Sequence, residues 1–347
     1  HPDNIWVYRM MGSTLAALRR PTDAEQVWRS LLKYDSSNAQ GNLALGALLV
    51  RQKKYDEAIP LLKKAASAKD AAVGVQQELG TAELEGGQKE AGIATLEQVM
   101  RTSNDPGIIN DAAYALADHD DDVAEAATFA VKALHTVEAS TCNINLATLT
   151  NQDLMRISQL GAIWDTVGWI DFKQAKYADA ERYVRAAWLL GQNPDVATHL
   201  GEIYQREGKL AEARHMRKLT AAKAPVPPPQ ASKIQVTFKS ASAHRTDAEL
   251  YLQEVQNLRT VQISGLPRKM AAAQFWLVFS PRGVEEIKMI TGDAALSKAA
   301  DQIKKHKYPQ TFPDPGPVKI VRRGVLSCSQ FTSTCQLVLL QPQWTQL

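Results

Sequence analysis

Small residues recur along this chain at a fixed interval. Three glycines stand 34 residues apart, and another small residue follows each of them twelve positions later; the glycines are Gly12, Gly46 and Gly80, and their partners are Ala24, Ala58 and Gly92. The distance between two packed helices depends on the side chains where they cross, so small residues at a fixed spacing mark close crossings. The spacing therefore predicts a stack of helix pairs, and function is expected on its surfaces or in an attached segment.

A 34-residue period of helix pairs resembles the tetratricopeptide repeat. The resemblance implies a mainly α fold, namely an α-solenoid followed by a different C-terminal domain. Its units are expected at about 5–38, 39–72, 73–106, 107–140, 161–193 and 194–222. In the third unit Gly92 stands where alanine is usual, which predicts a helix weaker by about 1 kcal/mol.

Residues 141–160 interrupt the period. They begin with a polar stretch that predicts a loop, and Thr150 or Asn151 is expected to cap a lengthened helix after it. The repeats then resume with a step of 33 residues from Gly168 to Gly201. The sequence thus predicts two blocks of repeats with an insertion between them.

A proline-rich stretch at 223–233 separates two parts of opposite charge. Residues 1–222 carry 24 Lys and Arg against 29 Asp and Glu, whereas residues 223–347 carry 16 against 8. Prolines cannot continue a helix, so this stretch predicts a semi-rigid linker. We therefore expect two domains with different partners, one formed by the repeats and one by residues 234–347.

The part after the linker has the pattern of a small α+β domain. Helices are predicted around Ala248–Leu258 and, with Asp293 as its cap, over Ala294–Lys305. Strands are predicted at Val236 and Phe238, Val261 and Ile263, Phe275–Phe279, Val284–Ile290, Lys319–Leu326 and Gln336–Leu340.

Two of the three cysteines, Cys328 and Cys335, flank a polar stretch between two of these predicted strands. Two alternatives fit this placement: a disulfide across a hairpin, which implies an oxidising compartment, or two reduced, half-buried thiols. The absence of any C-x-x-C pair argues against a zinc site.

The sequence shows no catalytic motif. It has no glycine-rich phosphate loop, no H-E-x-x-H and no G-x-S-x-G, so we expect no enzyme activity and no cofactor. The acidic run Asp118–Asp122 contains carboxylates and an imidazole that a metal ion could use. Acidic residues also favour a turn and the start of a helix, and this second explanation leads us to expect no metal.

Partner binding is therefore the expected activity. Stacked repeats form a concave surface, which the first helix of each pair is expected to line. Helical spacing from the landmark positions gives the groove candidates Arg9, Gln40, Arg51, Gln77, Asp165, Trp169, Lys173, Glu202 and Arg206. Trp169 has two equally weighted interpretations, a binding hot spot or packing against the next repeat.

A basic cluster, Lys319, Arg322 and Arg323, lies on a predicted strand of the tail. It is suited to docking an anionic envelope surface, such as a cell-wall polymer or lipid headgroups. A solvated edge strand that is kept basic to prevent aggregation explains the cluster equally well.

Residues 258–342 resemble the C-terminal domain of TonB-type energy transducers, in which a short sheet packs on one helix. The resemblance is carried by Ser280–Gly283, Gly292–Asp293 and Phe312–Pro313. It implies the same arrangement of sheet and helix in this chain.

The chain is also similar to bacterial proteins that join a transglutaminase-like region, tetratricopeptide repeats and a tail of this type. The stretches Trp164–Trp169, His199–Tyr204 and Val321–Cys328 carry this similarity. It implies that His1 follows the transglutaminase-like part, that the protein is periplasmic or secreted, and that Cys328 and Cys335 form a disulfide.

Three hypotheses result. The first is a non-catalytic scaffold of the bacterial envelope that binds a peptide or protein in the repeat groove. The second is an accessory region that positions substrate for an upstream transglutaminase-like enzyme, and the third is a TonB-like transducer. We expect no nucleic-acid partner, and no apolar run approaches the roughly 20 residues needed to span a bilayer.

Overall fold

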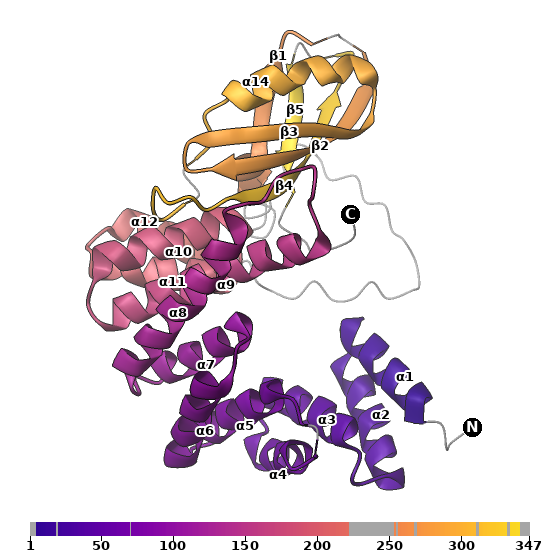
Figure 1. Cartoon of the computed structure of the whole chain (residues 1–347), viewed down its shortest axis with the longest axis vertical. Coiled ribbons are helices and arrows are strands. Elements are labelled where there is room, and N and C mark those ends of the chain that lie inside the picture. Colours follow the sequence, from indigo (N-terminus) through magenta and orange to yellow (C-terminus); the bar gives the residue numbers. More distant parts are fainter. Residues whose placement is uncertain are drawn as a thin grey trace, which may run out of the picture. The chain divides into compact units, whose positions relative to one another are not determined.

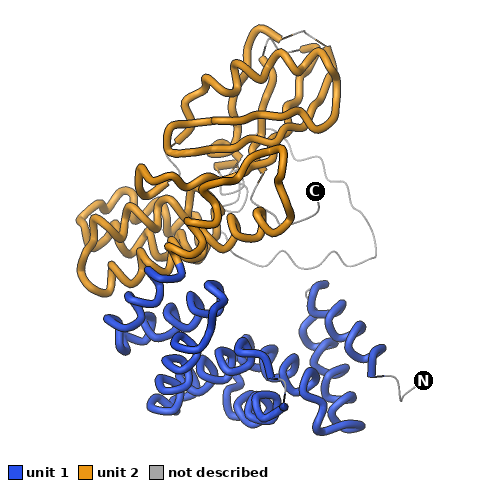
Figure 2. Tube along the Cα trace, viewed as in Figure 1, with its two compact units in different colours: residues 1–133 blue, residues 134–347 orange. Residues whose placement is uncertain are grey.

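The computed structural model describes residues 5–18, 20–69, 71–221, 253–254, 256–266, 269–309, 312–331 and 334–340. The chain divides into two compact units, residues 1–133 and 134–347 (Figure 2). This division falls within helix α8 (Val123–Thr141). The linker predicted at 223–233 lies outside the described residues, as does the strand predicted at Val236 and Phe238.

Unit 1 is built from helices joined by short turns (Figure 1). From α1 to α7 each helix packs on the next, and α5 also contacts α3 and α7. Alternate helices therefore share a face. The helices before α8 are α1 (Ile5–Ala17), α2 (Pro21–Tyr34), α3 (Ala39–Arg51), α4 (Tyr55–Ala66), α5 (Val73–Glu85), α6 (Lys89–Thr102) and α7 (Pro106–Asp118).

The glycines of the 34-residue series lie where the helices of a pair approach most closely. A Cβ atom added to Gly12 would lie 2.4 Å from the Trp28 ring, and one added to Gly46 would lie 2.7 Å from Cγ of Leu62. Both Trp28 and Leu62 are buried core residues. The predicted role of these glycines as close crossing points agrees with this packing.

Gly92 also lies at a close helix crossing, where packing opposes what helix propensity alone suggests. A Cβ atom there would lie 2.6 Å from the backbone nitrogen of Leu84 in the facing helix. Because backbone atoms cannot move aside as a flexible side chain does, alanine does not fit between α5 and α6. The close approach, rather than helix propensity, accounts for glycine at this position.

Unit 2 begins with the C-terminal part of α8 and continues with two further helix pairs. These are α9 (Asn151–Lys173) with α10 (Tyr177–Gly191), and α11 (Pro194–Arg206) with α12 (Leu210–Ala221). Thr150 caps the long helix α9: its hydroxyl accepts a hydrogen bond from Asp153 N at 3.2 Å, and Thr150 N donates to Oδ2 of Asp153 at 2.9 Å. This capping box decides between the two predicted caps.

The tail forms a five-stranded antiparallel sheet in the order β1-β5-β4-β2-β3. A 3-10 helix, η1 (Ala294–Ala299), and α14 (Ala300–Lys305) pack on one face through buried Leu296 and Ile303 (Figure 1). The strands are β1 (Thr260–Ser264), β2 (Ala271–Ser280), β3 (Gly283–Gly292), β4 (Ile320–Cys328) and β5 (Thr334–Leu339).

Most predicted elements of the tail are present among the described residues. Asp293 caps the helical segment by accepting a hydrogen bond from Ala295 N at 2.9 Å. The first half of that segment is a 3-10 helix, however, rather than part of one α-helix. Of the helix predicted at Ala248–Leu258, residues 253–254 and 256–258 are helical, and the rest lies outside the described residues.

The sheet and the second block of repeats are parts of one compact unit. The segment between α14 and β4 lies against α9 and α10: the Phe312 ring meets the Trp164 ring edge-on at 6.2 Å, and Tyr183 Oη donates to Oδ2 of Asp314 at 2.9 Å. On another side, Leu146 N donates to Oε2 of Glu286 at 3.0 Å. No helix among the described residues has the length and apolar character needed to cross a membrane.

Candidate partner-binding surfaces

The first helices α1, α3 and α5 carry the groove candidates of unit 1. Arg9, Gln40 and Arg51 are exposed, while Gln77 is half-buried and donates to Oγ1 of Thr81 at 3.1 Å. Since α5 contacts both α3 and α7, their polar side chains can act on one ligand. We call this surface the first-helix face.

Two carboxyl groups, Glu78 and Asp111, join Arg51 on the first-helix face. Burial raises the pKa of Glu78, the Arg51 charge opposes this rise, and the Asp111 charge adds to it. Burial likewise raises the pKa of Asp111, although its side chain is exposed to solvent. A carboxyl group that solvent can reach but that protein atoms surround is expected on a concave surface.

Glu78 and Asp111 were missing from the sequence-based candidates. Asp111 follows Gln77 by 34 residues and so occupies the equivalent place in α7. The period alone could have identified it. The 34-residue spacing identifies Asp111 once it is applied to the fourth unit, in which Tyr114 replaces the glycine.

In unit 2, the candidates Asp165 and Trp169 belong to a buried cluster rather than an open groove. Both carboxylate oxygens of Asp165 lie 3.0 Å from Nδ1 of His199. The Trp169 ring stacks on His199 at 4.2 Å and on Phe172 at 4.9 Å, and only 5% of Trp169 is exposed. This geometry supports the packing interpretation of Trp169 and corrects its use as an accessible hot spot.

The other candidates of unit 2 are more accessible. Lys173 is half-buried, with its Nζ 5.2 Å above the Trp169 ring. Glu202 and Arg206 are exposed on α11. Lys173, Glu202 and Arg206 stay predictions.

The basic cluster of the tail differs from both of its predicted roles. Its strand, β4, lies between β5 and β2, so the edge-strand explanation is wrong. Arg322 is only 4% exposed and donates to the Leu340 carbonyl at 3.2 and 3.3 Å, and burial lowers its pKa to about 10. Arg323 donates to Oε1 of Gln274, and Lys319 pairs with Glu285 at 3.1 Å. These partners leave little of the cluster for an anionic surface.

The acidic run before α8 forms ion pairs and a helix start. Asp121 pairs with Lys89 at 2.6 Å and His119 with Glu85 at 3.2 Å, while Oδ1 of Asp122 accepts from the nitrogen of Glu125 at 3.4 Å. Ligand atoms of Glu97, Asp122 and Glu125 do come within 4.8 Å of one another. The Arg101 guanidinium contacts both glutamates, at 3.0 and 2.7 Å, and supplies the positive charge there.

Cys328 and Cys335 are joined by a disulfide, with their Cα atoms 4.3 Å apart. The bridge links the end of β4 to β5. Cys142, at the end of α8, is a half-buried free thiol.

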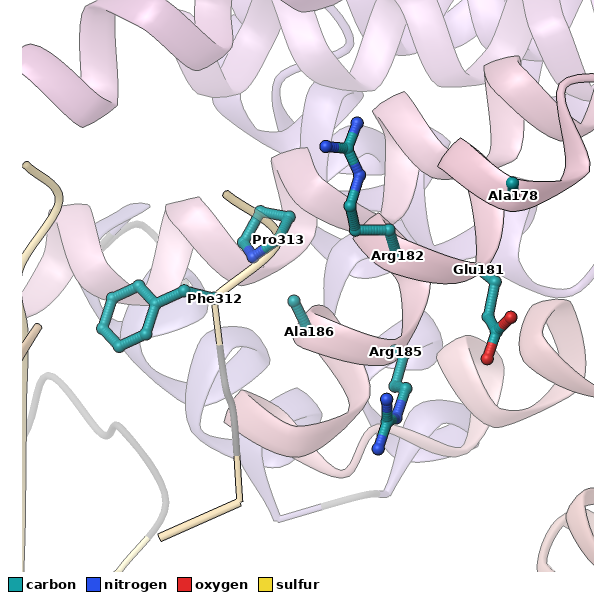
Figure 3. Close-up of a pocket in the computed structure, with 7 residues that line it drawn as sticks. All are labelled: Ala178, Glu181, Arg182, Arg185, Ala186, Phe312 and Pro313. Atoms are coloured by element: carbon teal, nitrogen blue, oxygen red, sulfur yellow. The ribbon is translucent and has the colours of Figure 1, made fainter. Parts of the chain in front are cut away.

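A pocket of about 300 Å³ lies between α10 and the segment that follows α14 (Figure 3). Arg182 and Arg185 of α10 extend in different directions, and the small side chain of Ala186 faces Phe312 and Pro313. The lining residues are Ala178, Glu181, Arg182, Arg185, Ala186, Phe312 and Pro313. Sequence analysis did not identify this pocket, because it depends on a contact between segments about 130 residues apart, such as that of Tyr183 with Asp314.

Comparison with known proteins supports the repeat assignment. Residues 9–72 match the family described as Tetratricopeptide repeat. Over 41 residues the chain is 54% identical to TPR repeat-containing protein PA4667 of Pseudomonas aeruginosa, a stretch that spans 12% of this chain and 7% of that protein.

Solved structures with a related arrangement include PilW, described as a widely conserved type IV pilus biogenesis factor. It has 14% sequence identity and a TM-score of 0.46, with 62% of this chain and 91% of PilW covered. MamA has 17% identity and a TM-score of 0.36, with 59% and 93% covered. The family match covers residues 9–72, and the helix pairs that continue to α12 make the helical part of this chain a tetratricopeptide-like α-solenoid, which is followed by a small antiparallel-sheet domain.

Proposed function

We propose that this chain is a non-catalytic scaffold that binds a peptide or protein partner along the first-helix face of unit 1. The observation that carries the proposal is the alignment of charged groups from three successive first helices: Arg51 from α3, Glu78 from α5 and Asp111 from α7. Helix α5 contacts both α3 and α7, and the charges of Arg51 and Asp111 both influence the pKa of Glu78, which supports treating the three groups as one surface.

The charge of this surface indicates the chemistry of the partner. Two carboxyl groups against one guanidinium favour a segment with basic side chains and at least one acceptor. Partial burial strengthens such pairs, because the surrounding protein lowers the local dielectric. An extended segment suits this surface, since successive repeats present their groups along one direction.

An envelope location is part of the same proposal. The Cys328–Cys335 disulfide supports it, because structural disulfides persist in oxidising compartments and are rare in the cytosol. No contact among the described residues supports the roles that the resemblances to transglutaminase-linked and TonB-type proteins imply, so neither role is proposed.

Crosslinking in the envelope of the native host, followed by mass spectrometry, tests the proposal. We expect wild type to capture a defined partner and Glu78→Gln with Asp111→Asn to lose most of it. The matched control is Asp56→Asn with Glu90→Gln, which removes two exposed carboxylates from the second helices α4 and α6 of the same unit. Equal capture by both double variants would refute binding on the first-helix face.

A further inference from the structure

Unit 2 contains a two-part pocket between helices α10, α11 and α12 and residues of the tail. The part shown in Figure 3 has a volume of about 300 Å³, between α10 and Phe312–Pro313. A second part of about 450 Å³ is bounded by α10, α11, α12 and residues 254 and 258. Arg185 lines both parts and therefore stands at their junction.

The charged groups around Arg185 are mostly paired. Arg182 pairs with Asp179 at 2.8 Å and also with Asp314, and Glu181 pairs with Lys209. At the other end of the larger part, Nε2 of His215 lies 2.5 Å from Oε1 of Glu254. The edges of the pocket are therefore polar, but these charged side chains already have partners within the protein.

Arg185 differs from these neighbours. It is exposed, and among the residues that the structure describes it has neither a hydrogen bond nor an ion pair. Arg185 and Tyr204 both line the larger part of the pocket. Burial raises the pKa of the Tyr204 hydroxyl, and the Arg185 charge opposes this rise. An arginine in this setting offers two parallel N–H donors to a carboxylate.

The larger part of the pocket is mainly apolar. Trp188 and Met216 form buried walls, and Tyr204 and Leu258 are half-buried beside them. Pockets that bind small groups combine such walls with a few placed polar atoms. The volume accommodates one large side chain next to the Arg185 guanidinium.

We propose that this two-part pocket binds a peptide segment in which a carboxylate lies beside a large apolar side chain. The carboxylate forms a bidentate pair with Arg185, and the apolar side chain enters the larger part against Trp188 and Met216. This site is distinct from the first-helix face, because it lies entirely within unit 2, whereas that face belongs to unit 1.

An array of synthetic peptides tests the proposal with the full chain. Each peptide has one fixed Asp, its neighbours are varied through all amino acids, and a matched set carries Asn at the fixed position. We expect wild type to prefer Asp over Asn by about tenfold when Phe, Leu, Met, Trp or Tyr lies within two residues. Equal binding of the Asp and Asn sets by wild type would overturn the proposal.

Three variants separate the contribution of each part. Arg185→Gln should abolish the preference for Asp, and Ala211→Phe should abolish the preference for a large apolar neighbour, since Ala211 is an exposed residue of the larger part. Lys218→Gln removes an exposed cation of α12 that lines neither part, and it should not weaken binding. Retained Asp preference in Arg185→Gln, with circular dichroism like wild type, would refute the assigned role.

The first-helix variants Glu78→Gln and Asp111→Asn should leave array binding unchanged, so this proposal and the proposed function can fail separately.

Discussion

Gly92→Ala is expected to destabilise unit 1, although alanine is the better helix former. The added Cβ would lie 2.6 Å from the Leu84 nitrogen and 2.8 Å from its Cα, whereas ordinary contact begins at 3.4 Å. Helices α5 and α6 would have to separate by about 1 Å at this point. Overpacking of this kind costs about 1–3 kcal/mol. The gain in helix propensity is about 1 kcal/mol, so a net loss of about 1 kcal/mol is expected.

Hydrogen exchange of the α5 and α6 amides in the full chain measures this change locally. A local method is preferable, because repeat arrays do not always unfold as one cooperative unit. A loss of 1 kcal/mol should speed exchange about fivefold in these helices. Ala94→Gly, at an exposed position of α6, is the matched control for propensity alone and should also speed exchange.

The two substitutions together distinguish the explanations. If propensity decided the stability at position 92, Gly92→Ala would slow exchange while Ala94→Gly would speed it. Slower exchange in Gly92→Ala would therefore refute the steric explanation of this glycine. It would also mean that the close approach of Leu84 relaxes at little cost.

Three further results are expected. Trp169→Ala should lower the stability of unit 2 by about 3–5 kcal/mol in thermal unfolding, because the ring is buried and stacked; a small loss would restore the hot-spot interpretation. Cys328→Ser should cost about 2–3 kcal/mol by releasing a bridge with a sequence separation of 7, and Cys142→Ser should leave the effect of reductant unchanged. Because the folded pKa of Glu78 is raised, folding binds a proton there, so stability should fall as pH rises from the ordinary value of 4.5 through the raised pKa. Glu78→Gln should flatten that part of the pH profile of α5 exchange, and an unchanged profile would contradict the raised pKa.

The sequence predicts well those features that depend on local patterns. The 34-residue period gives helix pairs, Thr150 and Asp293 are recognisable caps, and alternating apolar residues locate the strands of the tail. Such features need only the spacing of side chains along one element. The same reasoning considers only helix propensity at Gly92, whereas the atom that would meet a methyl group there belongs to another helix.

The sequence did not predict which side chains are buried by contacts between different elements of the fold. Arg322 belongs to a basic cluster in the sequence, yet it lies on an interior strand of the sheet with its guanidinium on the Leu340 carbonyl. Trp169 follows the groove spacing, yet His199, from the next helix pair, covers it. In both cases the strand order or helix stacking decides exposure, and neither is encoded in local periodicity.

These corrections also change where binding is expected. The excess of basic residues in the tail suggests an anionic partner, but Lys319, Arg322 and Arg323 use their charges within the sheet domain. Because a paired charge must be freed before it can bind a ligand, such residues contribute less to affinity than an unpaired one. Arg185 requires no such exchange, and it adjoins apolar walls that a neighbouring side chain can cover. In the proposed site the tail therefore acts less through its own charge than by completing, with Phe312 and Leu258, the pocket around an arginine of the repeats.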